Sequence, residues 1–133
     1  MRSEILKQDK EKCRFSVFIP ISRPWMVDKW FERFQKMDLP RKETELIVYL
    51  DHFNENLFKK IKGILLIDNS DFGTIKLYFS GRRTTPEYVG SPRRTRHVIM
   101  REDSRRIIGD TEFLIGLEPY TPCPIKTFPK LFK

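Results

Sequence analysis

Residues 113–122 read FLIGLEPYTP, and this segment decides the fold class that the sequence predicts. It begins as an apolar run typical of a buried strand, reaches the carboxylate of Glu118 and continues into a proline-rich turn. Two other apolar runs end similarly: residues 15–19 (FSVFI) lead into PISRP, and residues 45–50 (ELIVYL) lead into Asp51. Because α/β sheets bind ligands at the carboxyl ends of their strands, these three ends predict one shared crevice for a metal ion or a phosphate group.

Strand and helix patterns alternate along the rest of the chain. The predicted order is strand 15–19, helix 25–37, strand 45–50, helix 54–65, strand 74–79, helix 98–108, strand 112–117 and a short helix over 125–132. Such alternation predicts an α/β fold, a single three-layer domain with a mostly parallel, Rossmann-like sheet and helices on its faces. We expect this domain to span residues 15–133 and to follow a polar leader at residues 1–14.

The charge of the chain favours polyanionic partners. Its 26 Lys and Arg residues outnumber 18 Asp and Glu residues and give a net charge of +8. Arginines concentrate in residues 82–106, and guanidinium groups bind phosphate oxygens in pairs of hydrogen bonds. Nucleotide phosphates, nucleic acid and acidic membrane surfaces all fit this charge. A solvated basic surface that serves mainly solubility is the plainer alternative.

Several classes of protein are not expected from this sequence. Cys13 and Cys123 lack the spacing of a structural zinc site. The sequence lacks the P-loop, GxGxxG, HExxH and GxSxG motifs of other enzyme classes. The first residues lack the apolar core of a signal peptide, and no apolar run approaches the length of a membrane span. The sequence therefore predicts a cytoplasmic protein with no transmembrane segment.

Three segments together resemble the nucleotide-binding half of GT-A type glycosyltransferases. Residues 15–24 (FSVFIPISRP) are similar to the first strand of that family and its proline-containing turn. Residues 45–51 are similar to its second strand, which ends on an acid that contacts the nucleoside, and residues 112–122 to the strand that leads into its acidic metal motif. The resemblance implies that the chain binds a nucleoside-diphosphate sugar and transfers the sugar to an unknown acceptor.

The resemblance also implies roles for particular residues. Those that would contact the nucleotide follow the strand ends or lie in the arginine-rich segment: Pro20, Ser22, Arg23, Asp51, Arg94 and Arg101. The turn at residues 20–23 would line the nucleoside pocket, and the carboxylate at 51 would contact the base or the ribose. One of the two arginines would face the phosphates.

A divalent metal ion, Mn²⁺ or Mg²⁺, is the cofactor that the resemblance implies. Glu118 stands where the family has the first acid of its Asp-x-Asp motif, and Tyr120 stands in place of the second. These ions prefer carboxylate and water oxygens, so Glu118 is the candidate ligand. The ion would stabilise the departing nucleoside diphosphate as a Lewis acid.

Alternative interpretations stay open beside the transferase. Only eleven residues follow Pro122, where the family has its acceptor-binding half, so the chain is a fragment, a minimal relative or a non-catalytic descendant. The rival function is a basic nucleic-acid-binding module without catalytic activity, whose affinity would fall steeply with salt and with neutralisation of Arg93 and Arg94. A third is a structural or partner-binding domain that keeps the fold without the chemistry.

Overall fold

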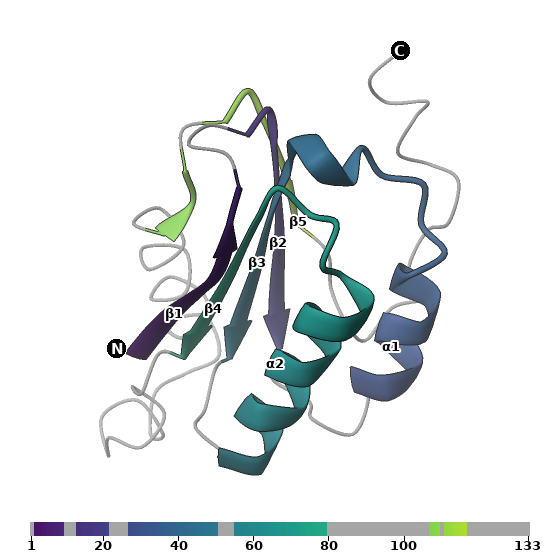
Figure 1. The fold of residues 1–133 in the computed structure, drawn as a ribbon, viewed down its shortest axis with the longest axis vertical. Coiled ribbons are helices and arrows are strands. Elements are labelled where there is room, and N and C mark those ends of the chain that lie inside the picture. The colour runs from purple at the N-terminus through teal and green to yellow at the C-terminus, as the bar shows by residue number, and fades with distance from the viewer. Residues whose placement is uncertain are drawn as a thin grey trace, which may run out of the picture.

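The structure, a computed structural model, describes residues 2–9, 13–21, 27–50, 55–79, 107–109 and 111–116. Within these residues five strands form one sheet: β1 (Arg2–Gln8), β2 (Phe15–Ile21), β3 (Thr44–Leu50), β4 (Thr74–Phe79) and β5 (Phe113–Gly116). Two α-helices and a short 3₁₀ helix accompany them: α1 (Val27–Phe34), α2 (Glu55–Asp68) and η2 (Arg41–Glu43) (Figure 1).

The sheet is mostly parallel, as the sequence predicts. Its strand order is β1-β4-β3-β2-β5, in which β2, β3, β4 and β5 run parallel and β1 runs antiparallel to β4. The chain steps away from β2 through α1, β3 and α2 to β4, and β5 then returns to the other side of β2. This arrangement confirms the predicted α/β, Rossmann-like fold.

The predicted elements agree closely with the observed ones where the pattern is strongly apolar. β3 begins one residue earlier than expected, β4 has the predicted bounds, and β2 continues two residues further, to Ile21. Helix α2 continues three residues beyond Leu65. The helix expected over 125–132 and most of the one expected over 98–108 lie outside the described residues.

The amino-terminal segment differs from its prediction. Residues 1–14 were expected to form a polar leader, but Arg2–Gln8 forms the edge strand β1. Only Ile5 and Leu6 are apolar in this strand, so no clear alternation marks it. Two of its side chains contact the rest of the domain: Leu6 packs against the core, and Glu4 forms an ion pair with Lys62 of α2 at 3.0 Å.

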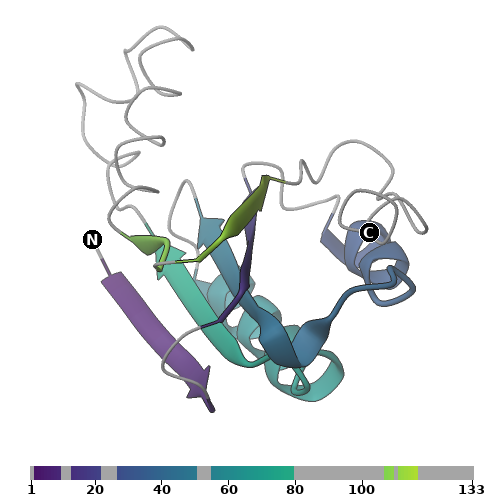
Figure 2. The same cartoon turned by 90° about the horizontal axis from the view of Figure 1, so that it is seen from above.

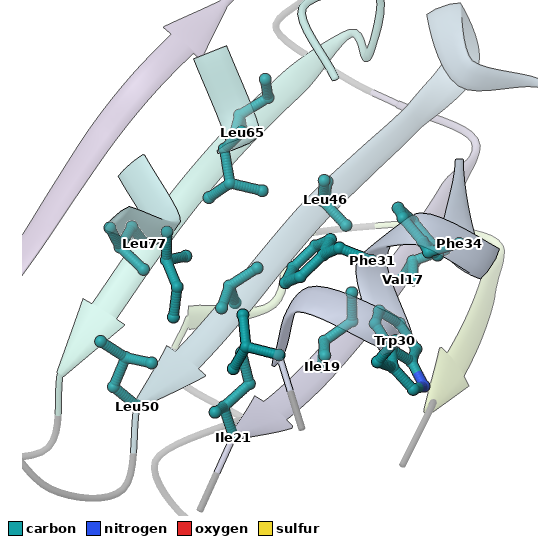
Figure 3. Close-up of a cluster of buried hydrophobic side chains, with 14 of the residues drawn as sticks. Val17, Ile19, Ile21, Trp30, Phe31, Phe34, Leu46, Leu50, Leu65 and Leu77 are labelled. Carbon is teal, nitrogen blue, oxygen red and sulfur yellow. The ribbon is translucent and has the colours of Figure 1, made fainter. Parts of the chain in front are cut away.

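Both α-helices pack on one face of the sheet, which we call the helix face. Alternate residues of β2, namely Phe15, Val17, Ile19 and Ile21, point to this face and join those of β3 and β4 under the helices (Figure 3). From α1 the buried side chains are Val27, Trp30, Phe31 and Phe34, and from α2 they are Leu57, Phe58, Ile61 and Leu65. Each such side chain contributes roughly 1.5–3 kcal/mol when fully buried, so this layer holds the sheet and the helices together.

The opposite face of the sheet, called here the second face, carries a smaller cluster. Phe18, Ile47 and Tyr49 pack there against Ile107. Figure 2 shows residues 107–109 on this side, away from the helices. Helices were expected on the faces of the sheet, and both α-helices of the described residues cover the helix face. No described helix is long and apolar enough to cross a membrane.

Candidate functional site

The carboxyl ends of three parallel strands lie in a row. Ile21 of β2 pairs with Leu50 of β3, and Leu50 pairs with Phe79 of β4. Figure 1 shows the arrowheads of these strands at the same edge of the sheet. Ligands of open α/β sheets bind in a crevice outside this edge, so this is the candidate site that the fold provides.

The strand order reverses at β2, between β3 and β5. Such a reversal separates the loops that leave the two neighbouring strands and opens a crevice between them. The last described pair between β2 and β5 is Phe18 with Gly116. β2 therefore continues for three residues, from Ile19 to Ile21, beyond its described pairing with β5.

Pro20 lies in this continuation of β2. It is half-buried, and it lies opposite Tyr49 of β3, the strand with which β2 is paired on that side. A proline supplies no N–H to a sheet and is tolerated where one side of its strand lacks a partner. Among the described residues that condition holds at Pro20, since the pairing with β5 ends at Phe18. Pro20 thus lies near the carboxyl end of β2, and its predicted role in binding a nucleoside stays a prediction.

The other predicted site residues lie outside the described residues, and their predicted roles stay untested: Ser22, Arg23, Asp51, Arg94, Arg101 and Glu118. Along the chain, Ser22 follows Ile21 and Asp51 follows Leu50, the two strand ends that pair in register. Glu118 comes two positions after Gly116, the last residue of β5.

The described strand ends carry no carboxylate, histidine or cysteine side chain. They are apolar, and no group of three His, Cys, Asp or Glu side chains gathers anywhere in the described part of the chain. Glu118, the carboxylate that the resemblance implies as a ligand, comes after β5, and Tyr120 replaces the second acid of the family motif.

A buried polar cluster on the second face escaped the sequence analysis. Glu45 of β3 is 3% exposed and binds Ser16 of β2, Lys76 of β4 and the backbone of Gly109. The available signal was an acid at the head of the otherwise apolar run LIVYL, with a lysine at an inward position of the next strand. Because charged side chains are rarely fully buried without partners, that pattern could have been read as an ion pair.

Comparison with known proteins supports the fold and no more. No protein-family model matches the chain, and no curated protein matches it. Among solved structures, S. aureus TarS, a glycosyltransferase, aligns with a TM-score of 0.52 and 16% identity over 89% of this chain. A structure of TarS 1-349 aligns with a TM-score of 0.48 and 17% identity over 80% of this chain. This chain spans 18% and 27% of those two chains, respectively. The fold is therefore distantly glycosyltransferase-like.

Proposed function

We propose that this chain binds a nucleoside-diphosphate sugar at the carboxyl edge of its sheet, as the nucleotide-binding half of a GT-A glycosyltransferase does. Transfer of the sugar to an acceptor is the activity that this binding would serve. The similarity to TarS supports the α/β fold alone. The proposal about the ligand rests on the arrangement of strand ends at the carboxyl edge of the sheet.

One observation carries the proposal: the reversal of strand order at β2, between β3 and β5. The ends of β2, β3 and β4 are aligned there, and β2 continues past the described end of β5. In sheets of this kind that position is where nucleotides bind. The sequence supplies suitable chemistry directly after these ends, since carboxylates pair with ribose hydroxyls and arginines with phosphates.

In this proposal, residues at and after the strand ends each contact a different part of the ligand. The turn that begins at Pro20 lines the nucleoside, Asp51 accepts hydrogen bonds from the base or the ribose, and Arg94 or Arg101 binds the diphosphate. Glu118 is the candidate ligand for Mn²⁺ or Mg²⁺, which would neutralise charge on the diphosphate when bound.

Isothermal titration with UDP, GDP, ADP and their sugar conjugates tests these roles. Asp51→Ala and Glu118→Ala should each weaken binding of the selected nucleotide by about tenfold or more, because each removes hydrogen bonds or ligation by a charged group. Asp38→Ala is the matched control, since Asp38 is an exposed acid in the connection from α1 to β3, at the other edge of the sheet. Unchanged affinity in both test variants would remove these assignments.

The alternative proposal is a basic module that binds nucleic acid without catalysis. Its supporting observation is the net charge of +8, with arginines concentrated in residues 82–106. The logarithm of its binding constant for DNA or RNA should fall linearly with the logarithm of salt concentration, because each neutralised phosphate releases counterions. Neutralising Arg93 and Arg94 should reduce that slope, and an affinity indifferent to salt would contradict the alternative.

A further inference from the structure

The carboxylate of Glu45 is fully enclosed on the second face and has a partner for each oxygen. Oε2 accepts a hydrogen bond from Ser16 Oγ at 2.7 Å and another from the backbone N–H of Gly109 at 3.0 Å. Oε1 forms an ion pair with Lys76 Nζ. A buried carboxylate requires such partners, because removing an ion from water costs several kcal/mol.

These contacts join three neighbouring strands to one distant stretch of chain. We call residues 107–109 and 111–112 the lead-in segment, since they precede β5. Lys76 Nζ also donates to the carbonyl of Ile107 at 3.3 Å, and the hydroxyls of Ser16 and Thr111 are 2.8 Å apart. Ser16 has a single O–H, which is directed to Glu45, so Thr111 is the donor in this pair.

Close backbone approach makes the position of the lead-in segment specific. A Cβ atom at Gly109 would stand 3.1 Å from both carboxylate oxygens of Glu45, which is tighter than ordinary contact. Glycine at this position therefore lets the backbone N–H reach the carboxylate. The segment and the charged side chains fit each other in one arrangement, and displacement of the segment would leave the charge short of a donor.

The lead-in segment passes directly into β5 and its pairing with β2. The backbone N–H of Glu112 donates to the carbonyl of Arg14 at 2.9 Å, and the rings of Phe113 and Phe15 stack with centroids 5.6 Å apart. From there β5 runs in register with β2 as far as Gly116. Whatever fixes the lead-in segment also fixes where β5 delivers the residues that follow it.

We propose that Glu45 and Lys76 are a positioning pair: they hold the lead-in segment against the second face and thereby set β5 for nucleotide binding at the carboxyl edge. The part of this inference that concerns the nucleotide rests on the proposed function. Neither side chain touches the ligand. Both act through the backbone of residues 107–116.

Amide hydrogen exchange of the full chain tests the positioning role without any ligand. In Glu45→Gln and in Lys76→Met, exchange in peptides that cover residues 107–116 should accelerate about tenfold or more, because a charge-assisted interaction with the segment is lost. Exchange in α2 should stay at its wild-type rate. Lys76→Arg keeps the charge and should restore most of the protection. If Glu45→Gln fails to fold, Ser16→Ala, which removes a single hydroxyl, replaces it.

Glu112→Gln is the matched control. It neutralises an acid of the same segment whose ion pair, with Arg14 at 3.0 Å, is solvent-exposed. Because exposed pairs contribute little, exchange in residues 107–116 should change by less than about threefold. Unchanged exchange of the segment in both Glu45→Gln and Lys76→Met would overturn the inference. An equal increase in α2 would also overturn it, since the effect would then be global loss of stability.

Nucleotide titration of the same variants separates this inference from the proposed function. If the wild-type chain binds a nucleoside diphosphate, Lys76→Met should weaken that binding about tenfold and Lys76→Arg should largely restore it. Unchanged affinity beside accelerated exchange would overturn the role in ligand binding. If the wild-type chain binds no nucleotide, the proposed function fails, and the exchange data alone decide whether the pair holds the segment.

Discussion

Gly73 and Gly63 differ in the space around them: a Cβ atom would be crowded at Gly73 and free at Gly63. A Cβ at Gly73 would stand 2.5 Å from the backbone carbonyl oxygen of Lys42 and 3.2 Å from the sulfur of Cys13. The N–H of Gly73 also donates to the carbonyl of Arg41 at 2.9 Å, which holds it against η2. A Cβ at Gly63, in the middle of α2, would meet nothing within 4 Å.

The two alanine substitutions should therefore change stability in opposite directions. Gly73→Ala forces a backbone shift beside a packed strand and should cost about 1–3 kcal/mol. Gly63→Ala should stabilise the chain by roughly 0.5–1 kcal/mol, because alanine loses less backbone entropy in a helix. Urea unfolding of both variants measures this. Equal effects of the two substitutions would contradict the close approach of Gly73 to η2.

Trp30 is the residue whose packing and hydrogen bonding disagree. It is 4% exposed and stacks on Phe34 with ring centroids 5.1 Å apart, yet its indole N–H finds no acceptor among the described residues. Figure 3 shows the nitrogen at the rim of the buried cluster. An unpaired buried donor of this kind costs about 1–3 kcal/mol in the folded state.

Replacement of Trp30 should consequently depend on ring volume and not on the N–H group. Trp30→Phe keeps an aromatic ring and removes the unpaired donor, so it should cost less than about 1.5 kcal/mol. Trp30→Ala removes the whole ring and should cost about 3–5 kcal/mol. Thermal and urea unfolding compare the two. A similar large loss in both would show that the N–H group makes a stabilising hydrogen bond.

At the scale of elements, β1 shows how weakly a single strand can be encoded. Its neighbouring apolar residues face opposite sides of the sheet: Ile5 is 59% exposed, whereas Leu6 packs against the core under α2. The pairing with β4 shifts register between Ile5 and Lys7, so the strand carries an irregularity at this point. One partly buried side chain and the ion pair from Glu4 to Lys62 accompany the backbone pairing.

A pair of lysine substitutions tests this arrangement. Leu6→Lys should destabilise the chain by more than about 1 kcal/mol, because an ammonium group replaces a partly buried apolar side chain. Ile5→Lys should stay within about 0.5 kcal/mol of the wild type, since it lies on the exposed side. Urea unfolding midpoints of the two variants, compared with that of the wild type, measure these changes in stability. Equal cost in both would mean that β1 does not pair with β4 in the register described here.

At the scale of the whole molecule, the sequence predicted the central sheet because its strands are buried. β2 and β3 are apolar over most of their length, and that pattern identifies strands whose two faces are both covered. β4 was predicted from its alternation of apolar and polar residues. β1 was missed because its pairing with β4 is made by the backbone, and Leu6 is its one side chain that packs against the core. The cluster at Glu45 was missed because its partners come from residues up to 64 positions apart in the chain.

The candidate site was also predicted only in part from the sequence. The alternation of strands and helices predicted a mostly parallel sheet, and the ends of β2, β3 and β4 do lie side by side. The order of the strands was not predicted, and ligand binding at this edge stays a prediction. Pro20 alone of the predicted site residues lies among the described residues, within β2. The side chains that would contact a ligand belong to the connections after the strands, where apolar periodicity carries no information about position.

The central claim is that the carboxyl edge binds a nucleoside diphosphate or its sugar conjugate. A thermal-shift titration of the full chain with UDP, GDP, ADP, CMP and their common sugar conjugates, each with and without Mn²⁺, tests it most directly. A ligand that binds only the folded state raises the unfolding temperature by mass action. We expect a saturable shift for one nucleotide, larger with Mn²⁺ and lost in Asp51→Ala. No shift with any nucleotide, with or without the metal ion, would contradict the claim.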